Sequence, residues 1–230
     1  MIKDNIARVK ERIAESAGRA GRDMSGIKLI AVSKTKPAED IYEAYSEGLT
    51  AFGENYVQEM LAKQDSDFLK SLPNIEWHMI GHIQTNKVKH IVGKTTLIHS
   101  LDSIRLAEEI QKQANKLNIV IDVLLEINIA REKNKFGFFS EEVENAVIKL
   151  SECSNINVCG LMTSAPFTLV PEQNRLYFRK LHELSLDIRC KSIHNIHMRD
   201  LSMGMSGDFE VAIEEGATML RIGTSLFGQR

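Results

Sequence analysis

Strand-like apolar segments recur along the whole chain and alternate with helical patterns. Most of these segments are apolar on consecutive residues, which is typical of parallel strands covered on both faces. The sequence predicts strands at residues 27–33, 51–53, 75–81, 97–101, 120–129, 158–163, 193–201 and 219–222. Between them it predicts helices at residues 38–47, 55–70, 86–92, 103–117, 140–151, 171–186 and 208–215.

This alternation predicts an α/β protein with a single (β/α)8 TIM barrel, a fold of about 250 residues that suits a chain of 230. An additional amphipathic helix over residues 2–18 precedes the first strand, and we expect it on the barrel exterior or at its bottom. A doubly wound open sheet is the alternative, because the strand count alone does not prove closure. No linker-like segment divides the chain, so we expect one domain over residues 1–230.

Composition narrows the class of partner. The chain has 29 basic and 31 acidic residues, and this balance argues against the concentrated positive charge of a nucleic-acid-binding protein. Its three cysteines form no C-x-x-C pair, and no apolar stretch reaches the ~18–20 residues that span a bilayer. The histidines show no metal-ligand spacing. We therefore expect a cytoplasmic protein without a membrane segment, a nucleic-acid partner or a metal.

A lysine follows the first predicted strand. Burial at a strand end can desolvate the ammonium of Lys34 and leave its amine able to attack an aldehyde. The alternative is a side chain that simply extends to solvent. Lys36 lies on the same face of an extended chain, and the following Pro37 disfavours it only weakly. The residues alone therefore leave both lysines as candidates.

Glycine, serine and threonine follow the last two predicted strands. In barrels of this kind, a phosphate often binds to backbone N–H groups after strands seven and eight. Ser202, Gly204 and Ser206 follow the seventh strand here, and Gly223 and Thr224 follow the eighth. Each stretch alone also fits ordinary turn and capping chemistry. Together with an aldehyde-reactive lysine, they point to pyridoxal 5′-phosphate (PLP), which carries both an aldehyde and a phosphate.

Five segments of the chain resemble the pyridoxal phosphate homeostasis protein family. These segments are AVSK at 31–34, FGENYVQE at 52–59, WHMIGHIQTNK at 77–87, LSMGMS at 201–206 and RIGT at 221–224. Members of this family are single-domain barrels similar to the N-terminal half of bacterial alanine racemase. They hold PLP as a Schiff base and have no well-established catalytic activity.

The resemblance implies a role for each matching residue. It selects Lys34 over Lys36 as the residue that forms the Schiff base. Besides Lys34, it implies that Ser206, Gly223 and Thr224 bind the phosphate, with Ser202 and Gly204 nearby. It also implies Arg221 at the pyridine nitrogen and Asn55 near the ring. It implies no catalytic residue.

An arginine at the ring nitrogen bears on function. A guanidinium can only donate hydrogen bonds, so it keeps that nitrogen unprotonated and weakens the ring as an electron sink. Only residues 225–230 remain after the predicted phosphate loop that follows the last strand, so we expect the β domain with which racemases supply a second base to be absent. We therefore expect a monomeric, non-catalytic carrier or buffer for intracellular PLP, which influences amino-acid and keto-acid metabolism and has PLP-dependent apo-enzymes as candidate partners. The alternatives are a minimal PLP-dependent amino-acid racemase and, third, a class I aldolase that uses Lys34 against a phosphorylated sugar.

Overall fold

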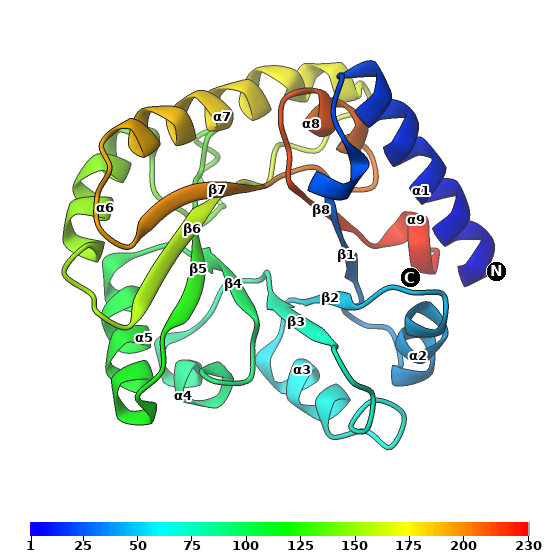
Figure 1. Cartoon of the computed structure of the whole chain (residues 1–230), viewed down its shortest axis with the longest axis horizontal. Coiled ribbons are helices and arrows are strands. Elements are labelled where there is room, and N and C mark those ends of the chain that lie inside the picture. The colour runs from blue at the N-terminus through cyan, green and yellow to red at the C-terminus, as the bar shows by residue number, and fades with distance from the viewer. Residues whose placement is uncertain (230) are drawn as a thin grey trace.

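The computed structural model describes residues 1–229 and contains a closed barrel of parallel strands (Figure 1). In chain order the strands are β1 Lys28–Val32, β2 Ala51–Glu54, β3 Glu76–Met79, β4 Leu97–Leu101, β5 Ile121–Glu126, β6 Ile156–Met162, β7 Ile196–Ser202 and β8 Met219–Ile222. Each strand pairs with the next one along the chain, and β8 pairs back with β1 in the register Lys28 to Met219. This last pairing confirms the barrel and excludes the open sheet.

Helices surround the strands in the part of the chain described. They are α1 Ile2–Arg19, α2 Ala38–Ser46, α3 Val57–Gln64, α4 Val88–Ile91, α5 Ile104–Leu117, α6 Val143–Leu150, α7 Arg175–Cys190, α8 Phe209–Glu214 and α9 Thr224–Phe227. Short 3₁₀ turns lie at Met24–Gly26, Thr85–Lys87, Ser140–Glu142 and Pro171–Asn174.

Two predicted helices have different ends in the structure. The helix expected over residues 55–70 ends at Gln64, where the Ser66 hydroxyl donates to the Lys63 carbonyl and the chain continues as turns. Serine favours such local bonds over helix continuation. The helix expected over residues 171–186 begins instead with the 3₁₀ turn Pro171–Asn174 and continues to Cys190.

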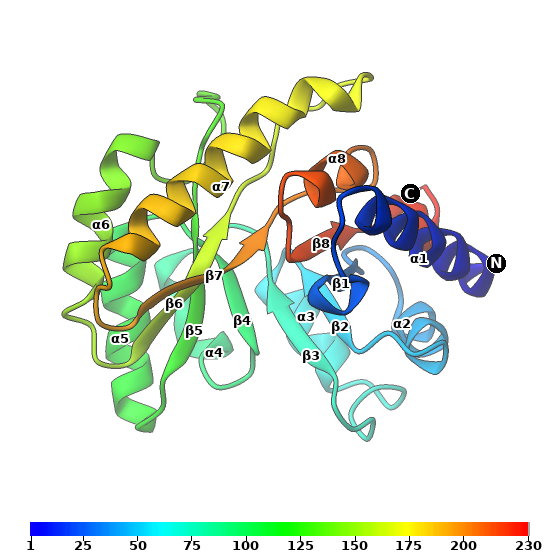
Figure 2. The ribbon, with the colours of Figure 1, turned by 45° about the horizontal axis from the view of Figure 1, so that its top comes forward.

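The N-terminal helix α1 lies on the barrel exterior, one of the two places expected for it. It packs against α8, α9 and α2 and brings the two ends of the chain close together (Figure 2). Its buried stripe includes Ile6, Val9 and Ile13, with the spacing of three and four residues that the sequence shows. Asn5 Nδ2 donates to the Leu226 carbonyl at 2.8 Å, which ties α1 to the C-terminal turn.

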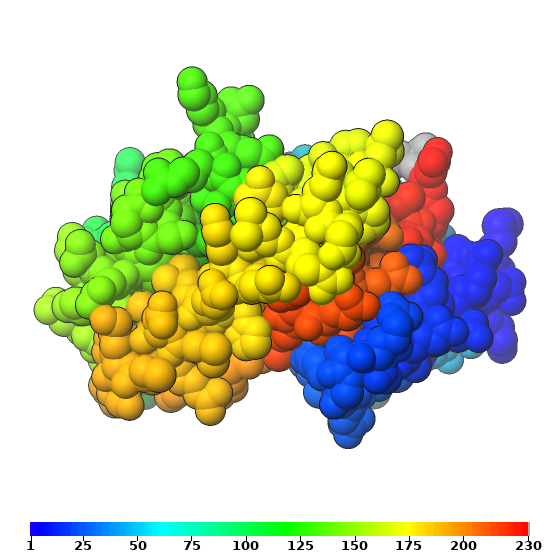
Figure 3. Space-filling view, turned by 90° about the horizontal axis from the view of Figure 1, so that it is seen from above, coloured from blue at the N-terminus to red at the C-terminus, as the bar shows by residue number. Residues whose placement is uncertain are grey.

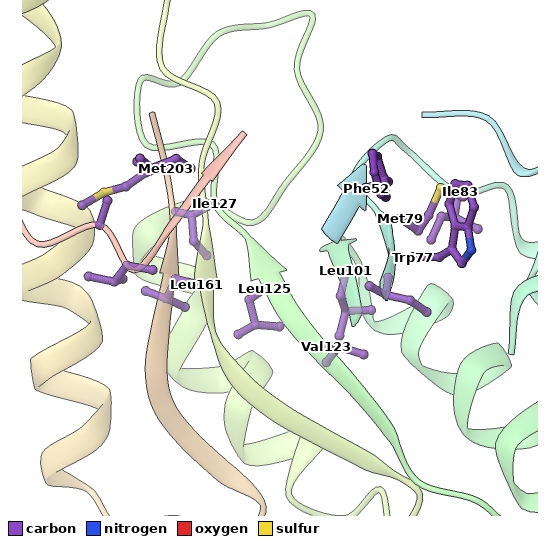
Figure 4. Close-up of a cluster of buried hydrophobic side chains, with 14 of the residues drawn as sticks. Phe52, Trp77, Met79, Ile83, Leu101, Val123, Leu125, Ile127, Leu161 and Met203 are labelled. Atoms are coloured by element: carbon purple, nitrogen blue, oxygen red, sulfur yellow. The ribbon is translucent and has the colours of Figure 1, made fainter. Parts of the chain in front are cut away.

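The apolar core has two parts, on the two faces of the barrel wall. The larger part lies between the strands and the helices and includes Phe52, Trp77 and Leu161 (Figure 4). A smaller cluster from alternating positions fills the barrel interior: Ile30, Ala51, Leu97, Leu124, Cys159, Met162 and Met219. The interior also contains buried histidine, serine and arginine side chains, which lie above and beside this small cluster.

The surface is uneven around the carboxyl ends of the strands. In the space-filling view, α7 forms a band across one face, and the green segment after β5 protrudes beyond the body of the molecule (Figure 3).

At the amino ends of the strands lies a polar pocket of about 480 Å³, lined by Lys28, Glu76 and Asp122 among others. Within residues 1–229, no helix combines the length and the apolar character that a membrane span requires.

Candidate functional site

The residues singled out in the sequence gather at the carboxyl ends of the strands. Lys34 lies two residues after the end of β1, Asn55 follows β2 directly, and Arg221 lies in β8. Because β1 pairs with both β2 and β8, the strand that leads to Lys34 lies between the strands of Asn55 and Arg221. In a parallel barrel these ends share one rim, which we call the mouth.

Lys34 lies in a tight turn, and its side chain is half-buried. The residue after it, Thr35, has a left-handed backbone with φ of 64°, a strained conformation for a residue with a branched side chain. The Thr35 N–H donates to Glu59 Oε1 at 2.5 Å, which ties the turn to the first turn of α3. The turn that presents Lys34 is therefore held from outside the barrel.

A buried lysine lies beneath this turn. Lys63 Nζ, on α3, donates to the Ser33 carbonyl, to Glu54 Oε1 and to Glu59 Oε1, each at 2.7 Å. Glu54 is fully buried, and its Oε1 also accepts the Ser33 hydroxyl at 2.6 Å. Burial raises the pKa of Glu54, whereas the bonds from Lys63 and Ser33 lower it. We call Lys63, Glu54 and Glu59 the Lys63 cluster.

The sequence analysis missed the Lys63 cluster. The signal that could have found it is the spacing of Glu59 and Lys63, which places an acid and a base on one side of a helix. A second signal is Glu54 at the end of an otherwise apolar strand.

The structure gives Lys36 a different role from that of Lys34. Lys36 Nζ donates to the carbonyls of Phe227 and Gln229, at 3.0 and 3.3 Å, at the end of α9. A cation at the C-terminal end of a helix satisfies carbonyls that have no partner within the helix. This capping role favours Lys34 over Lys36 as the lysine that faces a ligand, an alternative that the residues alone left open.

Arg221 is buried at the end of β8 and makes three directional contacts. Its Nη1 donates to Ser202 Oγ at 2.7 Å, and its Nη2 donates to the Thr163 carbonyl at 2.8 Å and contacts Ser164 Oγ at 3.3 Å. A guanidinium has five N–H groups, so at least two are left for a ligand. Burial lowers the pKa of Arg221 to about 10, so the group remains charged at neutral pH.

The loops after β7 and β8 meet, as the phosphate-site prediction requires. The Ser225 N–H donates to Ser206 Oγ at 3.2 Å, which joins the two loops directly. Gly223 is the N-cap of the helical turn α9, so the amides of that turn begin at Thr224. Ser206 and Gly223 are half-buried and Thr224 is exposed, so all three remain accessible at the mouth.

Ser202 is the last residue of β7 and Gly204 follows it closely, so both lie next to these loops. Ser202 is fully buried inside the barrel, where its hydroxyl contacts Arg221 and His99. Gly204 has a left-handed φ of 89°, and a Cβ there would lie 2.6 Å from the Cβ of Ala212. The Gly204 carbonyl accepts the Arg221 N–H at 3.0 Å. Each of the two residues therefore contacts Arg221.

Asn55 lines a pocket of about 580 Å³ at the mouth. The pocket includes Glu126 at the end of β5, where burial raises the carboxyl pKa to about 7. It also includes His82, whose Nδ1 lies 2.6 Å from Asp102 Oδ2 and whose ring stacks on Phe136 at 3.7 Å. The sequence analysis did not single out these groups, because strands and loops far apart in the chain bring them together.

The backbone at Asn55 also depends on a glycine. A Cβ at Gly81 would lie 2.5 Å from the Asn55 carbonyl oxygen, so the chain after β3 approaches the chain after β2 more closely than any side chain permits. Gly81 therefore fixes one wall of the pocket.

Comparison with known proteins adds to this geometry. The family described as alanine racemase, N-terminal domain, matches residues 2–230. A relative named pyridoxal phosphate homeostasis protein from Aquifex aeolicus is 51% identical over 227 residues, which cover 99% of this chain and 97% of the relative. Proteins of the same name from Pseudomonas aeruginosa and Mus musculus are 41% and 38% identical and cover 100% and 96% of this chain, and 96% and 84% of their own lengths.

Solved structures agree with these relatives. PipY from Synechococcus elongatus, solved without PLP, matches with a TM-score of 0.88 at 34% identity, over 99% of this chain and 100% of PipY. PipY with PLP bound matches with a TM-score of 0.85 at 33% identity over the same shares. Alanine racemase from Corynebacterium glutamicum shares only the fold, with a TM-score of 0.69 at 17% identity over 99% of this chain and 61% of the racemase.

The sequence relatives and the solved structures agree over nearly the whole length of the chain, and the mouth of the barrel carries the lysine, the arginine and the paired loops that the resemblance implies. This chain belongs to the pyridoxal phosphate homeostasis protein family.

Proposed function

We propose that this chain binds PLP covalently through Lys34 and serves PLP homeostasis as a non-catalytic carrier or buffer. The observation that carries the proposal is the arrangement at the mouth, where the turn of Lys34 lies one strand away from a buried, charged Arg221. The relatives named pyridoxal phosphate homeostasis protein and the PLP-bound structure of PipY support the same assignment.

The donor set of the mouth fits this cofactor. When bound, PLP supplies an aldehyde that condenses with an amine, together with a phosphate and a basic ring nitrogen. Lys34 offers the amine, and the free N–H groups of Arg221 suit a ring nitrogen that accepts a hydrogen bond. The amide of Thr224 and the hydroxyl of Ser206 lie where the two loops meet and suit the phosphate oxygens.

Arg221 argues against aminotransferase-like chemistry and so supports a carrier role. Its guanidinium is charged and only donates hydrogen bonds, so a ring nitrogen opposite it stays unprotonated and withdraws little electron density. Such a ring is a weak electron sink, so the site favours retention of the cofactor over carbanion chemistry. We infer PLP-dependent apo-enzymes as recipients, and a monomer in the cytoplasm as the working form.

Absorption spectroscopy of the purified protein with PLP tests the covalent link. We expect the wild-type protein to become yellow, and borohydride followed by peptide mass spectrometry to place the cofactor on Lys34. Lys34→Ala should abolish the label. Lys36→Ala is the matched control, because Lys36 caps α9, and it should retain the label. A label on Lys36, or a protein that stays colourless at saturating PLP, would refute the assignment.

A transfer assay separates a carrier from an enzyme. Loaded protein is mixed with a PLP-dependent apo-enzyme, and recovery of that enzyme's activity is timed against an equal concentration of free PLP. We expect the apo-enzyme to regain activity while the loaded protein loses its absorption. Steady racemisation of any amino acid in a panel, lost in Lys34→Ala, would instead establish the racemase alternative.

A further inference from the structure

A line of buried polar side chains runs through the barrel interior from Arg221 toward the opposite end. Arg221 Nη1 lies 2.7 Å from Ser202 Oγ, which lies 2.9 Å from His99 Nδ1. His99 Nε2 lies 2.9 Å from His78 Nδ1, and His78 Nε2 lies 3.5 Å from Glu76 Oε2. We call these five residues the interior chain.

The interior chain ends in the polar pocket at the amino ends of the strands. Glu76 lines that pocket and pairs with Lys28 at 2.5 Å. Ser202, His99 and His78 are buried, whereas the Glu76 side chain is about a third exposed, at 32%. The interior chain therefore connects the mouth with the opposite face through groups that water does not reach.

The direction of the hydrogen bonds along the interior chain follows from the groups at its two ends. Arg221 can only donate, so Ser202 Oγ accepts from it and can pass its own hydrogen to His99 Nδ1. His99 then carries its hydrogen on Nε2 and donates to His78 Nδ1.

At the far end, His78 consequently carries its hydrogen on Nε2, which lies 3.5 Å from the Glu76 carboxylate and has no hydrogen-bond partner among the described residues. Both imidazoles are neutral in this arrangement, and burial lowers the pKa of both. The 3.5 Å separation is long for a hydrogen bond, so this last link is the weakest of the chain.

The reverse direction leaves two groups badly placed. If His78 donated to His99, and His99 to Ser202, then the lone pair of His78 Nε2 would face the Glu76 carboxylate. Ser202 Oγ would also accept from both Arg221 and His99, and its own hydrogen would have no acceptor among the contacts of the described residues. A buried donor without a partner costs about 1–3 kcal/mol.

We propose that Ser202, His99 and His78 are positioning residues that hold the Arg221 guanidinium through a single directed hydrogen-bond chain that ends at His78, beside the Glu76 carboxylate. This inference rests on the proposed function, because its consequence is a fixed arginine opposite the ring of bound PLP. It assigns Ser202 to the support of Arg221, and it assigns a function to the polar barrel interior that the sequence analysis left unexplained.

NMR of the ligand-free protein tests the direction of the chain. Long-range ¹H–¹⁵N correlation of the imidazole rings at pH 7 should show His99 and His78 neutral and protonated on Nε2. Glu76→Gln should shift the His78 signals, whereas Asp122→Asn, a carboxylate change in the same far pocket, should leave them in place. Protonation of His99 on Nδ1, or a charged imidazole at either position, would overturn the proposal.

PLP binding tests the consequence for Arg221. Ser202→Ala removes one hydrogen bond from the guanidinium and should weaken PLP binding about tenfold, while borohydride still traps the cofactor on Lys34. Ser202→Thr restores the hydroxyl and should recover most of the affinity. Ser185→Ala is the matched control, because its buried hydroxyl donates to the His182 carbonyl at 2.7 Å within α7, away from the mouth and from the interior chain. We expect its affinity to stay within about twofold of wild type.

The outcomes separate this inference from the proposed function. Equal affinities and identical absorption spectra for Ser202→Ala and Ser185→Ala would refute the positioning role. A wild-type protein that never acquires PLP on Lys34 would refute the proposed function, whereas the tautomers of the ligand-free protein would still decide whether the directed chain exists.

Discussion

Lys34 and Arg221 lie at the same mouth, but charged side chains hold the turn of Lys34, whereas uncharged groups hold Arg221. The turn of Lys34 is held by the Lys63 cluster, in which a buried ammonium contacts two carboxylates. Arg221 is held by a serine hydroxyl, a backbone carbonyl and neutral histidines behind them, with no ion pair to it among the contacts of the described residues.

The difference has a physical basis in what each residue must do. Charged partners anchor the backbone on both sides of Lys34, at Ser33 and Thr35, from α3 outside the barrel. A carboxylate against Arg221 would neutralise the cation that is proposed to face the ring. Neutral partners fix its orientation and keep its charge available to the mouth.

The largest expected effect on stability comes from removing the ammonium of the Lys63 cluster. Lys63→Met leaves Glu54 and Glu59 close together without their counter-charge, so we expect the free energy of unfolding to fall by about 3–5 kcal/mol at pH 7. Protonation of Glu54 relieves this repulsion, so the loss should shrink between pH 7 and pH 5. Urea denaturation at several pH values measures both. A loss that does not depend on pH would show that the cluster acts by packing and not by charge.

Around Arg221, by contrast, stability should be sensitive to backbone geometry. Gly204→Ala places a Cβ 2.6 Å from Ala212 at a left-handed position, and the Gly204 carbonyl accepts the Arg221 N–H. We expect a loss of about 2–3 kcal/mol in thermal or urea unfolding. Gly207→Ala is the control, because it is exposed with open space around it and should change stability by less than about 0.5 kcal/mol. Equal losses for the two variants would contradict the strain argument.

Glu126 lies at the same mouth, and the way in which stability depends on pH tests whether its carboxyl is neutral in the folded protein. Burial raises the pKa of this carboxyl from 4.5 to about 7, so the folded protein binds a proton more tightly than the unfolded chain does. Stability should therefore fall as the pH rises from about 4.5 through 7, by an amount that we set at roughly 1–2 kcal/mol because the group is partly exposed.

Glu126→Gln should remove that part of the pH dependence and be the more stable protein at pH 8. Parallel unfolding curves of the wild-type and variant proteins from pH 5 to pH 8 measure the difference. Identical pH profiles would show that Glu126 titrates normally and that the mouth is well solvated.

An exposed ion pair provides the smallest effect and the reference for the first prediction. Lys191 Nζ lies 2.6 Å from Glu144 Oε1, as close as Lys63 lies to its partners, but both side chains are substantially exposed. We expect Lys191→Ala to change the free energy of unfolding by less than about 0.5 kcal/mol, because water screens the pair and the ordering of both side chains offsets the attraction. A loss comparable to that of Lys63→Met would refute burial as the source of the difference.

The sequence alone predicted the barrel and the region of the site. Consecutive apolar residues such as those of Leu97–Leu101 indicate parallel strands with both faces covered, and the regular return of helices between them fixes the order of the elements. Lys34 and the loops at Ser206 and Thr224 were predicted from their places at strand ends, because all such ends meet at one rim, whereas the role of Arg221 came from the family resemblance.

Only the tertiary structure decided how these groups are supported. The pairing of β8 with β1 closes the barrel, and sequence spacing cannot show closure because the pairing joins the first strand to the last. The contact between Ser202 and His99 spans 103 positions of sequence, so no local pattern indicates it. Lys34 and Lys36 lie two residues apart on the same face of an extended chain, and the contact of Lys36 with the end of α9 gives them different structural roles. Local spacing determines which side chains reach the mouth, whereas the contacts that orient them come from residues that are neighbours only after the barrel has closed.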